Sequence, residues 1–176
     1  MEGRIRPALL KVLHASQHCG VPGKSIFDAV ATVRDAVAYA EMANPPLCVL
    51  SIDFKEAFDK ISHKNLFAIL QSYGFSDALL WCIENVYRNA ISVVHINGYI
   101  SGPTPIQSFI RQGWPLSMAL FALCLNPLLF RLDQTLNGLR IHQRQRQSAV
   151  IAYAGDITLL ITTAEDIDAE RRNTML

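Results

Sequence analysis

The sequence predicts a single domain of the α+β class, in which helices and strands mix without a regular β-α-β rhythm. Three observations support this prediction. Apolar residues recur at helical spacing, short apolar runs are typical of strands, and two turn dipeptides each join a pair of such runs. With 176 residues, 51% of them hydrophobic and 18% charged, the chain can bury a core, which excludes intrinsic disorder.

The first half of the chain is expected to contain three helices and one strand. The segment from Ile26 to Ala40 follows helical spacing, which Asn44-Pro45-Pro46 ends. The apolar run Leu47–Phe54 follows these prolines directly, so we expect a buried strand. Ser62 and Ser76 are suitable helix N-caps. The helices that they would begin cover roughly residues 63–73 and 77–89.

The second half is expected to contain two hairpins and a core helix. Asn97-Gly98 lies within the β-rich segment Ser92–Tyr99, which is a strong hairpin signal. The uncharged segment Gln112–Phe130 approaches membrane-spanning length, but polar residues and prolines interrupt it, so a buried core helix is expected over Leu116–Leu132. Finally, Ala149–Tyr153 and Ile157–Ile161 flank a turn and are apolar enough for the middle of a sheet.

Charge and cysteine content narrow the functional classes. A net charge of +1 gives no global basic field, so nucleic-acid binding would need a local groove. The four cysteines have no C-x-x-C spacing, which argues for buried reduced thiols over zinc or a disulfide scaffold. No secretory signal follows Met1, so an intracellular protein without a membrane partner is expected. The basic stretch Arg140–Arg146 is expected to be a solvated loop, with phosphate contact as the alternative.

Two carboxylates follow strand-like runs. Asp53 ends the expected strand, and Asp156 lies at the turn of the second hairpin. If these strands are neighbours, the carboxylates repel each other unless divalent cations lie between them. Such ligands suit Mg²⁺, which binds one or two carboxylates together with substrate phosphates. Spacing alone favours a plainer interpretation, in which one Asp caps a strand and the other is solvated.

Four motifs in order carry a family resemblance. Ser51–His63 resembles the first catalytic motif of reverse transcriptases from non-LTR retrotransposons, and Gln17–Ser25 resembles their upstream Q-x-G-F-x-P-G-R-S segment. Arg111–Ser117 is similar to R-Q-G-C-P-L-S, and Ala152–Asp156 stands where the family has [YF]-A-D-D. The resemblance implies the palm of a right-handed polymerase, a ferredoxin-like antiparallel sheet backed by helices. Residues 1–46 would then belong to the fingers side and residues 47–176 to the palm.

The resemblance implies a metal centre. Asp53 and Asp156 would be the catalytic residues and would bind Mg²⁺, and the carbonyl of Phe54 would be a further backbone ligand. In the intact family, two ions of this kind assist transfer of a deoxynucleotide to a primer 3′-hydroxyl. The implied partners are an RNA template, a DNA primer and deoxynucleotides.

Three further residues match positions that contact substrate in the family. Phe58 falls at an aromatic steric gate, a ring that would clash with a ribonucleotide 2′-hydroxyl, and a core aromatic is an equal alternative. Gln112 and Gly113 match the loop that approaches the incoming nucleotide and template. A glycine there lets backbone come close to a ligand, and a plain turn is the alternative for Gly113.

Departures from the family pattern predict an inactive copy. Gly155 replaces the first Asp of the Asp-Asp pair, so a principal metal ligand is missing, and Trp114 stands where Cys is usual. From the resemblance, we also expect the chain to lack the family's basic fingers strands and its thumb. The alternatives are a remnant that binds nucleic acid without catalysis, or an inert relic of a retroelement. Palm surface that the fingers and thumb would otherwise cover is expected to favour self-association.

Overall fold

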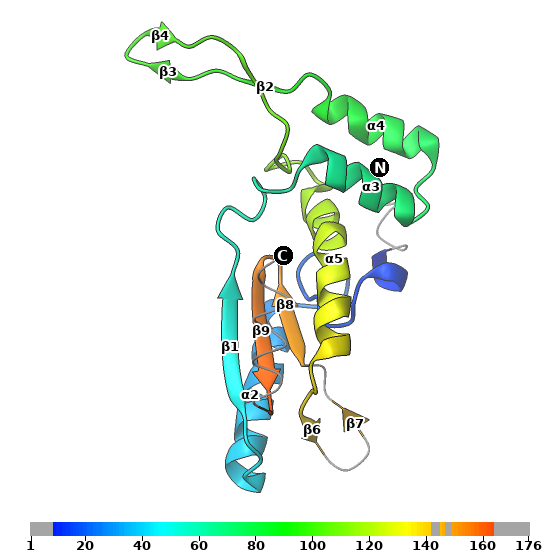
Figure 1. Ribbon diagram of the computed structural model, residues 1–176, viewed down its shortest axis with the longest axis vertical. Helices are drawn as coiled ribbons and strands as arrows, with labels where there is room; N and C mark the ends of the chain where they lie inside the picture. Colours follow the sequence, from blue (N-terminus) through cyan, green and yellow to red (C-terminus); the bar gives the residue numbers. More distant parts are fainter. Residues whose placement is uncertain (1–8, 142–144, 147–148, 164–176) are drawn as a thin grey trace. The chain divides into compact units, whose positions relative to one another are not determined.

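The computed structural model describes residues 9–141, 145–146 and 149–163 (Figure 1). The chain divides into two compact units. Unit 1 consists of residues 1–55 and 125–176, and unit 2 consists of residues 56–124. Both units combine helices with antiparallel strand pairs, which agrees with the α+β class expected from the sequence.

Unit 1 is built on a three-stranded antiparallel sheet with the order β1-β9-β8. These strands are β1 (Cys48–Asp53), β8 (Val150–Tyr153) and β9 (Asp156–Ile161). The expected hairpin around Ala154-Gly155 is confirmed, because β8 pairs with β9 across that turn. All residues of β8 except Tyr153 are buried, and β9 lies between its two partners.

The expectation of a buried strand at Leu47–Phe54 is wrong for β1. Cys48, Val49, Ser51 and Asp53 are exposed, and the other two residues of the strand are only half-buried. The reason is topological, since β1 lies at the edge of the sheet and pairs with β9 alone among the described strands. An apolar run after prolines therefore formed a strand, as expected, but an exposed edge strand.

One face of this sheet is covered by α2 (Ile26–Ala43), the helix expected after residue 25. A capping box begins it, because the Asp28 carboxylate accepts from the Ser25 backbone N–H at 2.6 Å. Buried Ala29 and Ala36 pack with Ile151 and Leu160 of the sheet. Small side chains on the inner face let the helix lie close to the strands.

The expected core helix is α5 (Ser117–Thr135), which runs from unit 2 into unit 1. It continues through Pro127, whose ring lies on the exposed side. Leu120, Leu123 and Leu129 are fully buried.

Beyond α5, the basic stretch expected as a loop forms a short strand pair, β6 (Arg140–Ile141) with β7 (Gln145–Arg146). His142 and Arg144 lie outside the described residues.

Unit 2 contains α3 (His63–Ser72) and α4 (Asp77–Tyr87), close to the ranges expected. The Ser62 hydroxyl accepts the Asn65 N–H at 3.2 Å, which confirms that N-cap. Ser76 occupies the N-cap position of α4 without a side-chain hydrogen bond. Each serine therefore marks its helix, although only one caps it with its side chain.

A narrow β arm follows α4 in unit 2 (Figure 1). The expected hairpin is confirmed, and Asn97 (φ 50°) and Gly98 (φ 83°) have the two positive φ values of a type I′ turn. Residues 91–105 are exposed throughout. The arm pairs β2 (Ile91–Ser92) with β5 (Thr104–Pro105), and β3 (His95–Ile96) with β4 (Tyr99–Ile100).

The cysteines are free, but their burial differs from the expectation. Cys48 is exposed on β1, and the other three are half-buried. Burial raises the pKa of the Cys124 thiol to about 12, so this thiol stays protonated at neutral pH.

Within the described part of the chain, every helix is too short or too polar to cross a bilayer.

Candidate metal centre and nucleotide loop

Asp53 and Asp156 are direct partners in the register of β1 and β9. This pairing confirms the prediction that the two carboxylates lie on adjacent strands of one antiparallel sheet. Residues directly opposite each other on such strands share a face, with Cβ atoms about 4.5–5.5 Å apart. Both side chains are exposed, so a ligand can reach them from solvent.

The donor set of this pair suits a hard divalent cation. Two like charges opposite each other in a sheet destabilise it, and a cation between them would relieve that repulsion. Mg²⁺ commonly uses one or two carboxylates and takes its remaining ligands from water and substrate phosphates. Among the described residues, no group of three or more His, Cys, Asp or Glu side chains gathers that could hold a metal. A cation at this position would therefore have two protein ligands, the carboxylates of the pair.

The turn between β8 and β9 places Gly155 directly before Asp156. Ala154 takes a positive φ of 54°, which is uncommon for a residue with a side chain. Gly155 is not among the described residues with positive φ. An aspartate at position 155 would therefore meet no left-handed backbone strain, so the missing carboxylate is a matter of residue type and not of turn geometry.

Gln17 holds this turn from a distant part of the chain, a role that its local sequence does not indicate. Its side chain is fully buried, and its Oε1 accepts the N–H of Ala154 at 3.2 Å and of Cys19 at 3.0 Å. The neighbouring backbone pairs with β8, because Ala152 donates to Ser16 and accepts from His18. The sequence signal for Gln17 was its position at the start of the upstream family segment Gln17–Ser25.

Cys19 lies beside the same turn and hydrogen-bonds with Tyr153. Burial raises the pKa of the Cys19 thiol, so it is protonated at neutral pH. A protonated thiol is a poor metal ligand. The carboxylates of Asp53 and Asp156 are therefore the groups at this end of the sheet that suit a cation.

Phe58 in unit 2 packs against another aromatic ring. Its ring stacks on Phe121 with centroids 4.4 Å apart and planes 20° from parallel. The Phe58 carbonyl also accepts the Ile110 N–H at 2.8 Å. The half-buried side chain thus has the packing of a core aromatic, and its role as a steric gate stays a prediction.

Gln112 and Gly113 form an exposed turn before α5. Gly113 has φ 78°, a conformation that favours glycine. The turn is tied at its base, where the Ser117 hydroxyl donates to the Arg111 carbonyl. Trp114, which replaces a usual cysteine, packs edge-on against Tyr87 with ring centroids 6.1 Å apart. The Trp114 ring therefore packs beside the turn, and Gln112 and Gly113 stay exposed to solvent.

The residues assigned by sequence fall into two groups. Asp53, Asp156 and the half-buried Phe54, which follows β1, belong to unit 1. Phe58 and the Gln112-Gly113 turn belong to unit 2. The structure pairs the two carboxylates with each other, while the ligand role of the Phe54 carbonyl stays a prediction.

Comparison with known proteins places these features in a family context. The family profile described as "Reverse transcriptase (RNA-dependent DNA polymerase)" matches residues 1–175. The chain is 33% identical over 165 residues to the "Transposon TX1 uncharacterized 149 kDa protein" of Xenopus laevis, covering 94% of this chain and 13% of that protein. It is 28% identical over 127 residues to the "Retrovirus-related Pol polyprotein from type-1 retrotransposable element R2" of Popillia japonica, covering 72% and 20%.

Solved structures share the fold at low sequence identity. A structure of apo telomerase from Candida tropicalis matches with a TM-score of 0.69 and 10% identity, over 100% of this chain and 34% of that one. A telomerase structure from Candida albicans, solved with a fragment of telomeric RNA, matches with a TM-score of 0.63 and 12% identity, over 97% and 31%. The fold of this chain is therefore similar to part of these telomerase structures.

Proposed function

We infer that this chain, which belongs to the reverse transcriptase (RNA-dependent DNA polymerase) family of non-LTR retrotransposons, serves as a palm segment of such a polymerase. The α+β palm fold expected from the motifs is confirmed by the likeness to telomerase. The chain spans 13% and 20% of the two retroelement relatives described above. Residues 1–46 are proposed as the fingers side and residues 47–176 as the palm.

The observation that carries the proposed chemistry is the pairing of Asp53 with Asp156 across β1 and β9. We assign these carboxylates to Mg²⁺, with the Phe54 carbonyl as a backbone ligand. When bound, such ions supply positive charge for the attacking and leaving oxygens of phosphoryl transfer. Gln112 and Gly113 are assigned to the incoming deoxynucleotide, and Phe58 to discrimination against the ribose 2′-hydroxyl. The substrates are then an RNA template, a DNA primer and deoxynucleotides.

Gly155 weakens this centre. A glycine supplies no carboxylate, so water must replace one negatively charged ligand. Removal of one preorganised electrostatic group typically costs about 10²–10³ in rate. We therefore propose that this copy retains the fold and the surface for nucleic acid, and that its DNA synthesis falls below detection.

Primer extension tests this proposal. Purified protein is given an RNA template, a DNA primer and deoxynucleotides with saturating Mg²⁺, and the assay is repeated with Mn²⁺. We expect no product from the wild type, because Gly155 supplies no carboxylate to the metal centre. We also expect none from Gly155→Asp, because one restored carboxylate does not replace the positioning of substrates, which contributes roughly 7–11 kcal/mol of the barrier, and the assayed chain spans 13% of the TX1 relative. Robust extension by the wild type would contradict the proposed loss of activity, and extension by Gly155→Asp alone would identify Gly155 as its sole cause.

A further inference from the structure

A pocket of about 430 Å³ opens in unit 1, between α2 and the sheet face that this helix covers. Its volume lies within the range of about 300–1,000 Å³ that is typical of ligand sites. This α2 pocket is defined by residues of the helix and of the sheet, which include Ile26, Val30, Val33, Tyr153, Asp156 and Thr158.

The helix side of the α2 pocket is apolar. Its residues Ile26, Ala29, Val30 and Val33 follow the spacing i, i+3, i+4 and i+7, which places them on one face of a helix. Ala29 is buried against the sheet, whereas Ile26 is 46% exposed and Val30 is 59% exposed. These two larger side chains therefore present apolar surface that a ligand can cover.

The sheet side of the α2 pocket places an aromatic ring beside a carboxylate. Tyr153 and Asp156 are direct partners in the register of β8 and β9, and Ile151 and Thr158 are the next partners on the same face. Side chains two residues apart on a strand share a face, so these four line the pocket together. The Tyr153 side chain also hydrogen-bonds with Cys19, which helps to hold its ring in place.

The α2 pocket is negatively charged at its Asp156 end. Within the described residues, the Asp156 carboxylate has no ion-pair partner, and Asp53 lies opposite it across β1 and β9. Arg34 also lines the pocket, but its guanidinium lies 2.8 Å from the Asp35 carboxylate. The positive charge of the pocket is therefore paired, whereas the negative charge is not.

An organic cation with an apolar body matches both sides of this pocket. A tyrosine ring attracts an ammonium group within about 6 Å of its centroid, and a carboxylate accepts charge-assisted hydrogen bonds from the same group. A hydrated metal ion would use the carboxylate and leave the apolar side without a partner. An anion would be repelled by Asp156, and a neutral apolar molecule would leave that carboxylate without a partner.

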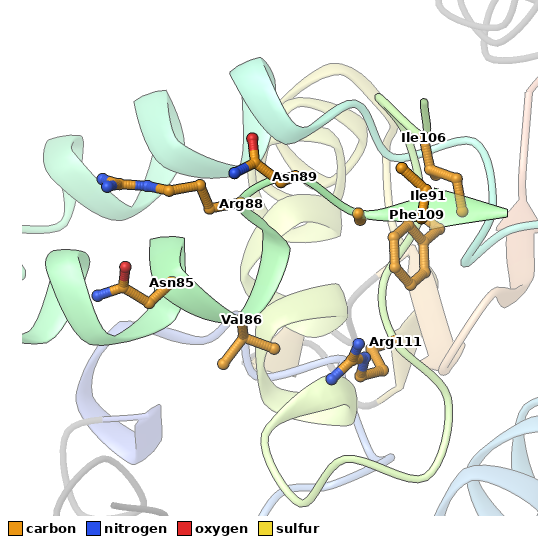
Figure 2. Close-up of a pocket in the computed structure, with 9 residues that line it drawn as sticks. Asn85, Val86, Arg88, Asn89, Ile91, Ile106, Phe109 and Arg111 are labelled. Atoms are coloured by element: carbon orange, nitrogen blue, oxygen red, sulfur yellow. The ribbon is translucent and has the colours of Figure 1, made fainter. Parts of the chain in front are cut away.

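The pocket of about 600 Å³ in unit 2 has a different charge (Figure 2). Figure 2 shows Arg88 and Arg111 among the residues that line it. Arg88 lies 3.5 Å from the Glu84 carboxylate, but within the described residues Arg111 has no carboxylate within ion-pair distance. The unpaired guanidinium disfavours an ammonium group there, so an organic cation should select the α2 pocket.

We propose that the α2 pocket binds a small organic cation, with its ammonium group between Asp156 and the Tyr153 ring and its apolar body against Ile26 and Val30. The site follows from the pocket and its charge, and it goes beyond the proposed polymerase function. One consequence does rest on that function, because such a cation would compete with Mg²⁺ for Asp156.

Two naphthalene probes of nearly equal shape test the charge of the ligand. At neutral pH, 1-naphthylmethylamine is a cation and 1-naphthylmethanol is neutral. Saturation-transfer NMR titrations measure both dissociation constants in EDTA, at a protein concentration low enough to keep the chain monomeric. We expect the amine to bind at least about fivefold tighter than the alcohol. Equal affinities for the two probes would overturn the proposal.

Asp156→Asn tests the carboxylate. The variant keeps the size of an exposed side chain and removes its charge, so the amine should lose its advantage and bind within about twofold of the alcohol. The matched control is Glu41→Gln, which removes an exposed carboxylate of α2 outside the pocket lining and should keep the advantage. An advantage that survives in Asp156→Asn, or that falls equally in Glu41→Gln, would overturn the proposal.

Ile26→Ser tests the apolar side. Loss of this wall should weaken both probes by a similar factor, about threefold, because each loses the same apolar contact. The matched control is Phe27→Ser, since Phe27 is the next residue of α2, is 79% exposed and does not line the pocket. Unchanged binding of both probes by Ile26→Ser, or equal losses in Phe27→Ser, would overturn the contact with α2.

Added Mg²⁺ separates this pocket from the metal centre. Weaker binding of the amine in Mg²⁺, with unchanged binding of the alcohol, would show that both cations use Asp156. An amine affinity that ignores Mg²⁺ but depends on Asp156 would support the pocket and contradict the metal centre. Equal binding of both probes that appears only on dilution of the protein would assign the pocket to a second copy of the chain, and would overturn the proposal.

Discussion

Gln17 links two segments that lie 137 positions apart in the sequence. Its buried side-chain oxygen accepts the N–H groups of Ala154 and Cys19, and within the described residues its Nε2 has no hydrogen-bond partner. A backbone N–H left without a partner in the interior costs about 1–3 kcal/mol. Gln17 is thus the side chain that fixes the turn before Asp156.

Gln17→Leu should loosen that turn. The change removes the side-chain oxygen that accepts the N–H groups of Ala154 and Cys19, so the free energy of unfolding should fall by roughly 1–3 kcal/mol. Urea denaturation measures this loss, and hydrogen exchange should show faster exchange at Ala154. Gln71→Leu, on the exposed side of α3, is the matched control and should change stability by no more than about 0.5 kcal/mol. Unchanged stability and unchanged exchange in Gln17→Leu would contradict this role.

Individual residues differ in how far the sequence predicts their conformations and roles. Asn97-Gly98 was predictable, because the positive φ values of a tight hairpin select those residue types. The pairing of Asp53 with Asp156 was predictable from strand ends and motifs taken together. The role of Gln17 was not, since a hydrogen bond over such a separation depends on the tertiary fold and leaves no local pattern.

Among the elements, β1 shows how composition predicts a strand but not its environment. Its apolar residues and preceding prolines indicated the strand, yet only β9 pairs with it among the described strands. Burial of a strand depends on its neighbours in the sheet and on the helices that cover it, and neither is local information. The edge position also keeps Asp53 exposed to solvent, as a metal ligand requires.

Among the described elements, α2 and the β arm expose several large apolar side chains each. On α2, Phe27 is 79% exposed and Val30 is 59% exposed. On the arm, Tyr99 is 83% exposed and Ile100 is 68% exposed. Exposed apolar surface, where it is contiguous, marks interaction sites or a tendency to aggregate.

The isolated chain should therefore self-associate. Size-exclusion chromatography with light scattering is expected to show an apparent mass that rises with protein concentration. The double variant Phe27→Ser/Val30→Ser removes apolar surface from α2 and should shift the equilibrium toward the monomer, because burial of these side chains would contribute about 25 cal/mol per Å². A wild-type monomer at high concentration would contradict this expectation.

At the scale of the whole molecule, three histidines make stability depend on pH. Burial is the largest cause that lowers the pKa of His14, His18 and His63. For His14, the opposing effect of Asp133 is smaller, and Lys24 lowers the pKa further. In each case the folded state binds its proton less readily than the unfolded state, whose histidines have a pKa near 6.5.

Stability should consequently fall as the pH is lowered through about 6.5. The unfolded chain binds more protons than the folded chain in this window, so the free energy of unfolding rises with pH and is largest above the unfolded pKa. Urea denaturation between pH 5.5 and 8 measures the slope. His14→Gln, which keeps a polar side chain without a titrating group, should flatten part of it. A free energy of unfolding that rises toward pH 5.5 would contradict the assignment.

The whole fold was predictable in class and family because four motifs occur in order along nearly the full chain. The division into two units was not predicted, since residues 9–55 and 125–163 join one sheet through contacts that are distant in sequence. A pocket lined by residues from the end of α4 to Arg111 was also not predicted, because these residues look, in sequence, like a helix end and a loop.

The most direct measurement of the central claim is a Mn²⁺ titration followed by electron paramagnetic resonance, in which Mn²⁺ stands in for Mg²⁺. It compares the wild type with Gly155→Asp and Asp53→Asn. Gly155 is not among the described residues with positive φ, so Asp at this position adds a carboxylate without left-handed strain. We predict weak binding by the wild type, binding about tenfold tighter in Gly155→Asp, and none detectable in Asp53→Asn, a tenfold step being about 1.4 kcal/mol. Equal affinity in all three proteins would show that the Asp53–Asp156 pair is not a metal centre.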